Sequence, residues 1–75
     1  MKDQRRLLNK CIEEEIPFMV ISGKDICSVP TLVKYLEEAK KQKCDPEFIA
    51  DFSLLLNDFI QFQKQEPEKI EKPNL

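Results

Sequence analysis

The stretch CDPEFIADFSLLLNDFIQFQ, residues 44–63, decides the fold that we predict for this chain. Asp45, Pro46 and Glu47 form a strong helix start, because aspartate caps free N–H groups, proline fits the first turn and an acidic side chain suits the positive helix end. The apolar side chains that follow fill an arc of roughly 160° on a helical wheel, wider than the roughly 100° stripe of a surface helix. The sequence therefore predicts a helix over residues 46–65 with more apolar surface than one neighbour covers.

Two shorter amphipathic helices are predicted before it. The first spans residues 3–15 and is closed by the Ile16-Pro17 boundary, since the residue before a proline is pushed away from helical geometry. The second spans residues 30–42, with Pro30 in its first turn. Its predicted buried face consists of Leu32, Val33, Tyr35, Leu36 and Ala39.

The run FMVIS, residues 18–22, reads as a β-strand with two apolar faces, which needs cover on both sides. A lone strand leaves its backbone groups unpaired. Either residues 26–28 fold back as a minimal partner or the strand pairs with a second copy, and we favour the second copy because the fold-back is so short. The predicted fold is therefore mainly α with one short β-strand: a helix, the strand, then an antiparallel two-helix hairpin, with the strand paired between subunits.

Self-association is the second expectation from these patterns. The unpaired strand and the surplus apolar face of residues 46–65 both favour a homo-oligomer, with a dimer first. Leu54 stands among polar side chains and is expected to be exposed. The candidate interface residues are Phe18, Val20, Leu54 and Phe62.

Length and composition predict one small domain. The chain has 75 residues and begins with Met1, and we expect it to be complete, with residues 1–65 folded and residues 66–75 an extended tail. Hydrophobic residues make up 41% and charged residues 35%, which is typical of globular proteins and not of disordered ones. The net charge of -2 argues against nucleic-acid binding, and no apolar run approaches membrane-spanning length.

The residue types offer little chemistry. The sequence contains no histidine, which removes the commonest acid/base group and metal ligand, so we expect no catalytic residue, metal or cofactor. The three cysteines, Cys11, Cys27 and Cys44, form no Cys-x-x-Cys pair and are expected to be buried and unpaired in a reducing cytoplasm.

The loop in ISGKDICSVPT, residues 21–31, resembles a phosphate-binding turn at first sight. A Walker loop needs a glycine five residues before Gly23 and a hydroxyl after Lys24, but Phe18 and Asp25 stand there. We favour a turn in which Asp25 or Ser28 caps the following helix. The alternative is an anion site that uses Gly23, Lys24 and Ser28.

Several segments together resemble a group of short uncharacterised proteins encoded by bacteriophages and integrated mobile elements: PFMVISGKD, CSVPTLVKYLEEAKK, a Cys-Asp junction and DFIQFQKQEPEKIEKPNL. The resemblance covers residues 16–75 and implies a setting, since the group has no established activity. It is compatible with binding of host proteins or capture of signalling nucleotides.

The sequence thus predicts a small non-enzymatic binding protein that associates with itself. Its other partner would be a host protein or a small molecule. The alternative is a nucleotide- or anion-sequestering protein that uses the loop at residues 22–28.

Overall fold

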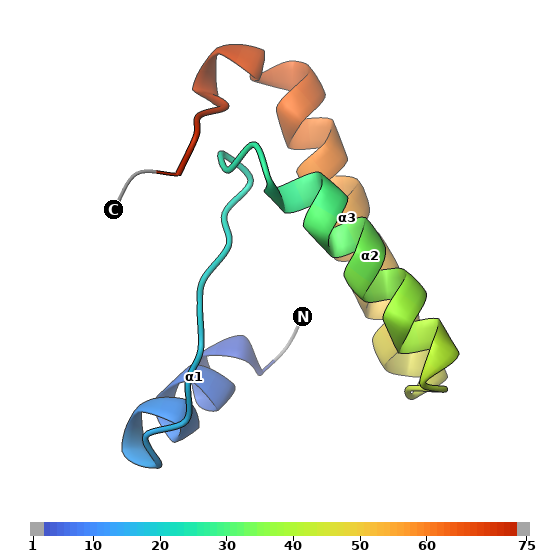
Figure 1. The fold of residues 1–75 in the computed structure, drawn as a ribbon. Coiled ribbons are helices and arrows are strands. Elements are labelled where there is room, and N and C mark those ends of the chain that lie inside the picture. Colours follow the sequence, from blue (N-terminus) through green and yellow to red (C-terminus); the bar gives the residue numbers. More distant parts are fainter. Residues whose placement is uncertain (1–2, 74–75) are drawn as a thin grey trace.

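The computed structural model describes residues 3–73, and most of them are helical (Figure 1). In chain order the elements are α1 (Gln4–Glu13), α2 (Ser28–Lys41), α3 (Pro46–Gln65) and a single 3-10 turn, η1 (Pro67–Lys69). The prediction of a mainly helical fold is confirmed.

Helix α3 has the predicted bounds and the predicted start. The Asp45 carboxylate accepts a hydrogen bond from the Glu47 N–H at 2.8 Å, and Pro46 occupies the first helical position. Helix α2 begins two residues before Pro30, at Ser28, so the proline still lies in the first turn, where its missing N–H is not needed. The two helices run side by side in opposite directions (Figure 1).

Both α1 and α2 end in the same left-handed turn, although neither end carries a glycine. Glu15 and Lys43 each have a φ of 55°. The Ile16 N–H donates to the Cys11 carbonyl at 2.9 Å, and the Cys44 N–H donates to the Ala39 carbonyl at 3.0 Å. These bonds satisfy carbonyls that a helix end leaves free, the Schellman arrangement that usually takes glycine at the left-handed position.

The core lies between α2 and α3. Leu32, Phe52 and Leu56 are buried at its centre, and Val29, Leu36, Phe48, Phe59 and Ile60 pack around them. Two members of the predicted α2 face lie at its edge instead: Val33 is 36% exposed and Tyr35 53% exposed. Tyr35 nevertheless stacks on Phe52, with ring centroids 4.8 Å apart, so its ring shields the core from one side.

Helix α1 stands apart from this hairpin. Its backbone makes no close contact with the backbones of α2 and α3 in the described part of the chain, and residues 16–22 lead away from it as an extended segment (Figure 1). Within residues 3–73 this segment forms no strand; the one β-bridge pairs Asp25 with Glu71 in parallel. We call α1 together with residues 14–21 the arm.

The C-terminal residues fold back toward the loop before α2. After η1, the Glu71 N–H donates to the Lys24 carbonyl at 2.8 Å, and the Glu71 carbonyl accepts from the Ile26 N–H at 3.0 Å. These two bonds join the segment after α3 to the loop before α2, so the loop at residues 22–28 contacts the C-terminal tail.

Candidate interaction surface

The loop at residues 22–28 is held in place by one side chain of α3. The Gln63 amide nitrogen lies 3.1 Å from the Gly23 carbonyl, 3.2 Å from the Asp25 carbonyl and 3.1 Å from the Ser28 hydroxyl. Ser28 is completely buried, and its hydroxyl donates to the Asp25 carbonyl at 2.7 Å. A single amide therefore ties the entry of α2 to the last turns of α3.

The backbone donors that an anion would need in this loop are already engaged. From Lys24 to Ser28 every backbone N–H donates within the chain: to the Ser22 hydroxyl and carbonyl, the Glu71 carbonyl, and the Asp25 carboxylate and carbonyl. The Asp25 carboxylate accepts from the Cys27 N–H at 2.7 Å, one turn before α2. Lys24 is exposed. This geometry is that of a closed structural turn.

Gly23 serves this turn by leaving space. Its φ is not positive, so residues other than glycine can adopt the same backbone conformation. A Cβ at this position would lie 3.1 Å from Cδ1 of the Phe62 ring, closer than side chains normally pack. Phe62, a predicted interface residue, is half-buried, and its ring lies beside the loop.

The other three predicted interface residues are exposed. Phe18 is 52% exposed and Val20 is 77% exposed on the arm, and Leu54 is 66% exposed on the outer side of α3. Sequence reasoning missed Leu7 and Met19, which are 63% and 76% exposed. Their exposure depends on how far α1 stands from the hairpin, which no local pattern reports. Cys27 is also exposed, contrary to the expectation of a buried cysteine.

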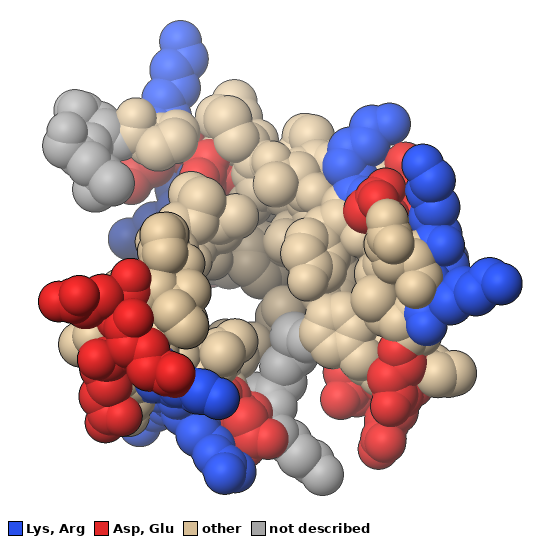
Figure 2. Space-filling view, turned by 60° about the horizontal axis from the view of Figure 1, so that its bottom comes forward, with Lys and Arg blue, Asp and Glu red and all other residues tan. Residues whose placement is uncertain are grey.

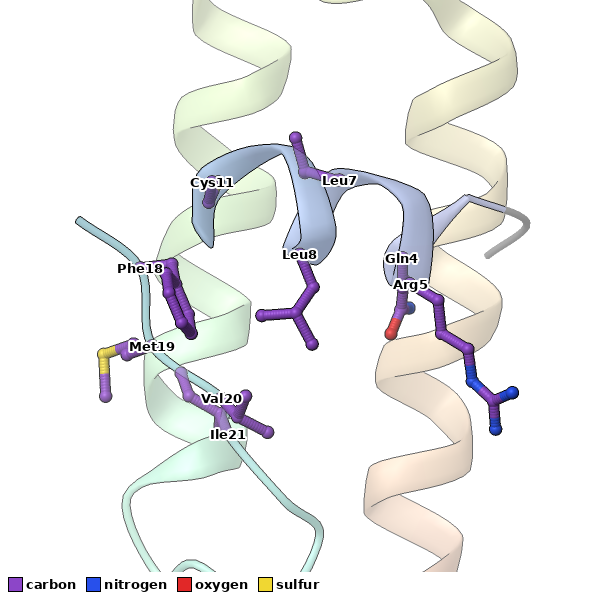
Figure 3. A pocket seen from close by; sticks show the side chains of 9 residues that line it. All are labelled: Gln4, Arg5, Leu7, Leu8, Cys11, Phe18, Met19, Val20 and Ile21. Carbon is purple, nitrogen blue, oxygen red and sulfur yellow. The ribbon is translucent and has the colours of Figure 1, made fainter. Parts of the chain in front are cut away.

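The arm encloses an apolar hollow of about 380 Å³, which we call the arm groove (Figure 3). Phe18 and Leu8 face one another across it, and Arg5 points away from it (Figure 3). The groove is lined by Gln4, Arg5, Leu7, Leu8, Cys11, Phe18, Met19, Val20 and Ile21. Of these side chains only Cys11 is buried, so the arm keeps an apolar surface that its own chain does not cover.

A second, wider hollow of about 750 Å³ separates the arm from the hairpin, and we call it the interhelix groove. Figure 2 shows an opening between these two parts of the molecule, with charged side chains gathered at the outer rims. On the hairpin side the lining consists of aromatic and acidic side chains. The lining residues are Asp3, Gln4, Leu7, Met19, Tyr35, Asp45, Glu47, Phe48, Asp51 and Phe52.

The whole chain exposes more surface than a compact monomer of its mass. Its accessible surface is 6496 Å², whereas a folded monomer of this mass exposes about 4,800 Å². Its radius of gyration is 13.6 Å, against about 11 Å for a compact domain of this length. The open arrangement of the arm and hairpin contributes to this surplus of about 1,700 Å².

The described residues contain no group of three or more side chains placed to hold a metal ion. Nor is any helix in the described part of the chain both long enough and apolar enough to cross a membrane. No family model, curated protein or solved structure matches this chain significantly.

Proposed function

We propose that this chain is a non-enzymatic binding protein that works as a homodimer, with the arm as its main contact surface. The surplus exposed surface is the observation that carries the proposal. If each chain buried its surplus accessible surface against the other, the interface would bury roughly 3,400 Å² in total, within the range of obligate homodimers. The exposed apolar side chains of the arm would pack against the second chain in such an interface.

The extended segment gives the dimer a specific contact. No backbone N–H or C=O of residues 18–21 is bonded to another backbone group in the described chain. A second copy related by a two-fold axis would present the same segment in the opposite direction, as antiparallel pairing requires. The predicted strand would then form between subunits, with Met19 and Val20 at its centre.

A binding role fits the chemistry of the chain better than catalysis. The sequence has no histidine, and the residues that first resembled a phosphate site support a turn, with Ser28 buried and the loop amides engaged. The anion-sequestering alternative is therefore less well supported than self-association. We propose that the dimer also binds a further partner, either a host protein or a small molecule.

Light scattering on the intact chain at micromolar concentration tests the proposal. We expect a mass of about twice 8.8 kDa. The double variant Met19→Asp/Val20→Asp should be monomeric with an unchanged helical signal, because both side chains are exposed within one chain and charge there disrupts only an intermolecular contact.

A control variant places one negative charge elsewhere. Thr31→Asp alters an exposed position on α2 outside both grooves and should leave the mass of the dimer unchanged. Leu54→Asp reports whether the outer side of α3 belongs to the interface. A monomeric parent protein across the micromolar range would overturn the proposal.

A further inference from the structure

Helix α1 carries a pair of like charges, Arg6 and Lys10, neither of which forms an ion pair within the described residues. Arg6 and Lys10 lie one helical turn apart, so their side chains are neighbours on the helix surface. Arg6 also lies near the positive end of the helix, where a cation is disfavoured, and the first turn has no acidic residue. Glu13 at the end of α1 and its C-cap residue Glu14 line the same surface hollow as Arg6 and Lys10, but no ion pair joins either glutamate to these cations.

Helix α3 carries the opposite pair at the same spacing. Glu47 and Asp51 are also four residues apart, which costs repulsion between neighbouring carboxylates. Both line the interhelix groove. The ion pairs in the described residues join Lys34 to Glu37 and Lys69 to Glu66, so neither carboxylate has a cationic partner there.

We propose that the interhelix groove receives α1 of a second copy, with Arg6 and Lys10 of one chain paired to Glu47 and Asp51 of the other. This inference rests on the proposed homodimer and identifies its electrostatic contact. Equal spacing allows both pairs to form together, and each relieves a repulsion within its own helix. The exposed Leu7, next to Arg6 on α1, would pack against the aromatic side chains of the groove lining, such as Tyr35.

A second copy fits better than the α1 of the same chain. That helix lies along the far rim of the groove, contributing Gln4 and Leu7, and the groove remains open, with no ion pair to its carboxylates among residues 3–73. A two-fold dimer makes the same contact twice, so four ion pairs form from one complementary surface. Opposite charges at such a surface mainly set the register of the dimer and exclude wrong partners.

Charge reversal tests the inference through the dissociation constant of the dimer. One variant is Arg6→Glu/Lys10→Glu, and the other is Glu47→Lys/Asp51→Lys. Either variant alone places like charges at both contacts, and its dissociation constant should rise about tenfold or more at low salt. Because lysine at the start of α3 can weaken the helix, Glu47→Gln/Asp51→Asn serves as a milder version, with a smaller rise expected.

Mixing the two reversed variants provides the decisive measurement. In a heterodimer every contact between α1 and α3 again joins opposite charges. Native mass spectrometry of an equimolar mixture should therefore show mainly the heterodimer, with an affinity near that of the parent protein. A single chain with all four substitutions should also regain parental affinity.

Two results would overturn the inference while leaving self-association intact. The first is a dimer as tight as the parent for each reversed variant and for the neutral variant. The second is rescue in the four-substitution chain without heterodimer formation in the mixture, which would place the ion pairs within one chain. A monomeric parent protein would instead remove the proposed homodimer itself.

Discussion

Replacing Gln63 with alanine should destabilise the chain more than any other change of a half-buried polar side chain on α3. Its amide nitrogen reaches three acceptors, at 3.1, 3.2 and 3.1 Å. Two hydrogens serve these acceptors, so about two full bonds are lost, at roughly 1 kcal/mol each. The Asp25 carbonyl keeps its bonds from the N–H and hydroxyl of Ser28, whereas the Gly23 carbonyl loses its side-chain donor.

The total cost of Gln63→Ala is therefore about 2 to 3 kcal/mol in the free energy of unfolding. That is a large part of the roughly 4 to 11 kcal/mol expected for a chain of this length. Urea unfolding followed by circular dichroism, at one fixed chain concentration, should show a midpoint lowered by roughly 2 M. Gln61→Ala is the matched control, since Gln61 has the same side chain on the same helix and is exposed.

The substitution Gln63→Glu tests the direction of the bonds. A carboxylate would face the Gly23 and Asp25 carbonyls without a hydrogen to donate, so its pKa should rise above the value of about 4.3 for a free glutamate. Because the folded-state pKa is raised, this variant should be least stable at neutral pH and recover as the pH falls and the carboxyl becomes protonated.

The reasoning about Gln63 fails if the free energies of unfolding of Gln63→Ala and Gln61→Ala differ by less than about 0.5 kcal/mol.

Three further outcomes are expected. Phe52→Ala should cost about 3 to 5 kcal/mol, because this ring is buried at the centre of the core. Phe59→Ala should cost less, since Phe59 is half-buried, and equal urea midpoints would contradict this ranking. Lys24→Ala should leave the melting temperature nearly unchanged, and nucleotides or cyclic dinucleotides should raise it for neither protein; a shift lost with Lys24 would support the sequestering alternative. Lys43→Gly should stabilise the chain by about 0.5 to 1 kcal/mol, because glycine adopts the left-handed turn after α2 without strain, and Lys43→Val should destabilise it in the same unfolding assay.

The parts of the fold that the sequence predicted are those with local signals. Asp45 followed by Pro46 marks the start of α3 because capping and proline geometry act within one turn. Pro17 indicated where α1 ends, but the left-handed turns after α1 and α2 had no local signal, since those positions hold Glu15 and Lys43 where glycine is usual. The start of α2 at Ser28 was also missed, because hydrogen bonds to Gln63, 35 residues away, fix that turn.

The candidate site was less predictable for a related reason. A Gly-Lys pair after an apolar run resembles a phosphate loop, but whether its amides are free depends on Glu71 and Asp25, which bond to them in the folded chain. Likewise, the alternation of apolar residues at 18–21 indicates a strand and cannot say which segment pairs with it. Such contacts between distant residues or between chains leave no periodic trace in a single sequence.

The arm also departs from the rules that the hairpin follows. In α3 the acidic Glu47 lies at the favourable positive end of the helix, and the apolar face is largely covered. In α1 the cationic Arg6 lies near the unfavourable end, and Leu7 stays exposed. Local conflicts of this kind persist in natural proteins where a contact outside the element offsets them. A second chain that brings carboxylates to α1 and apolar cover to the arm would resolve both conflicts at once, which is why we place the binding surface there and not at the glycine loop.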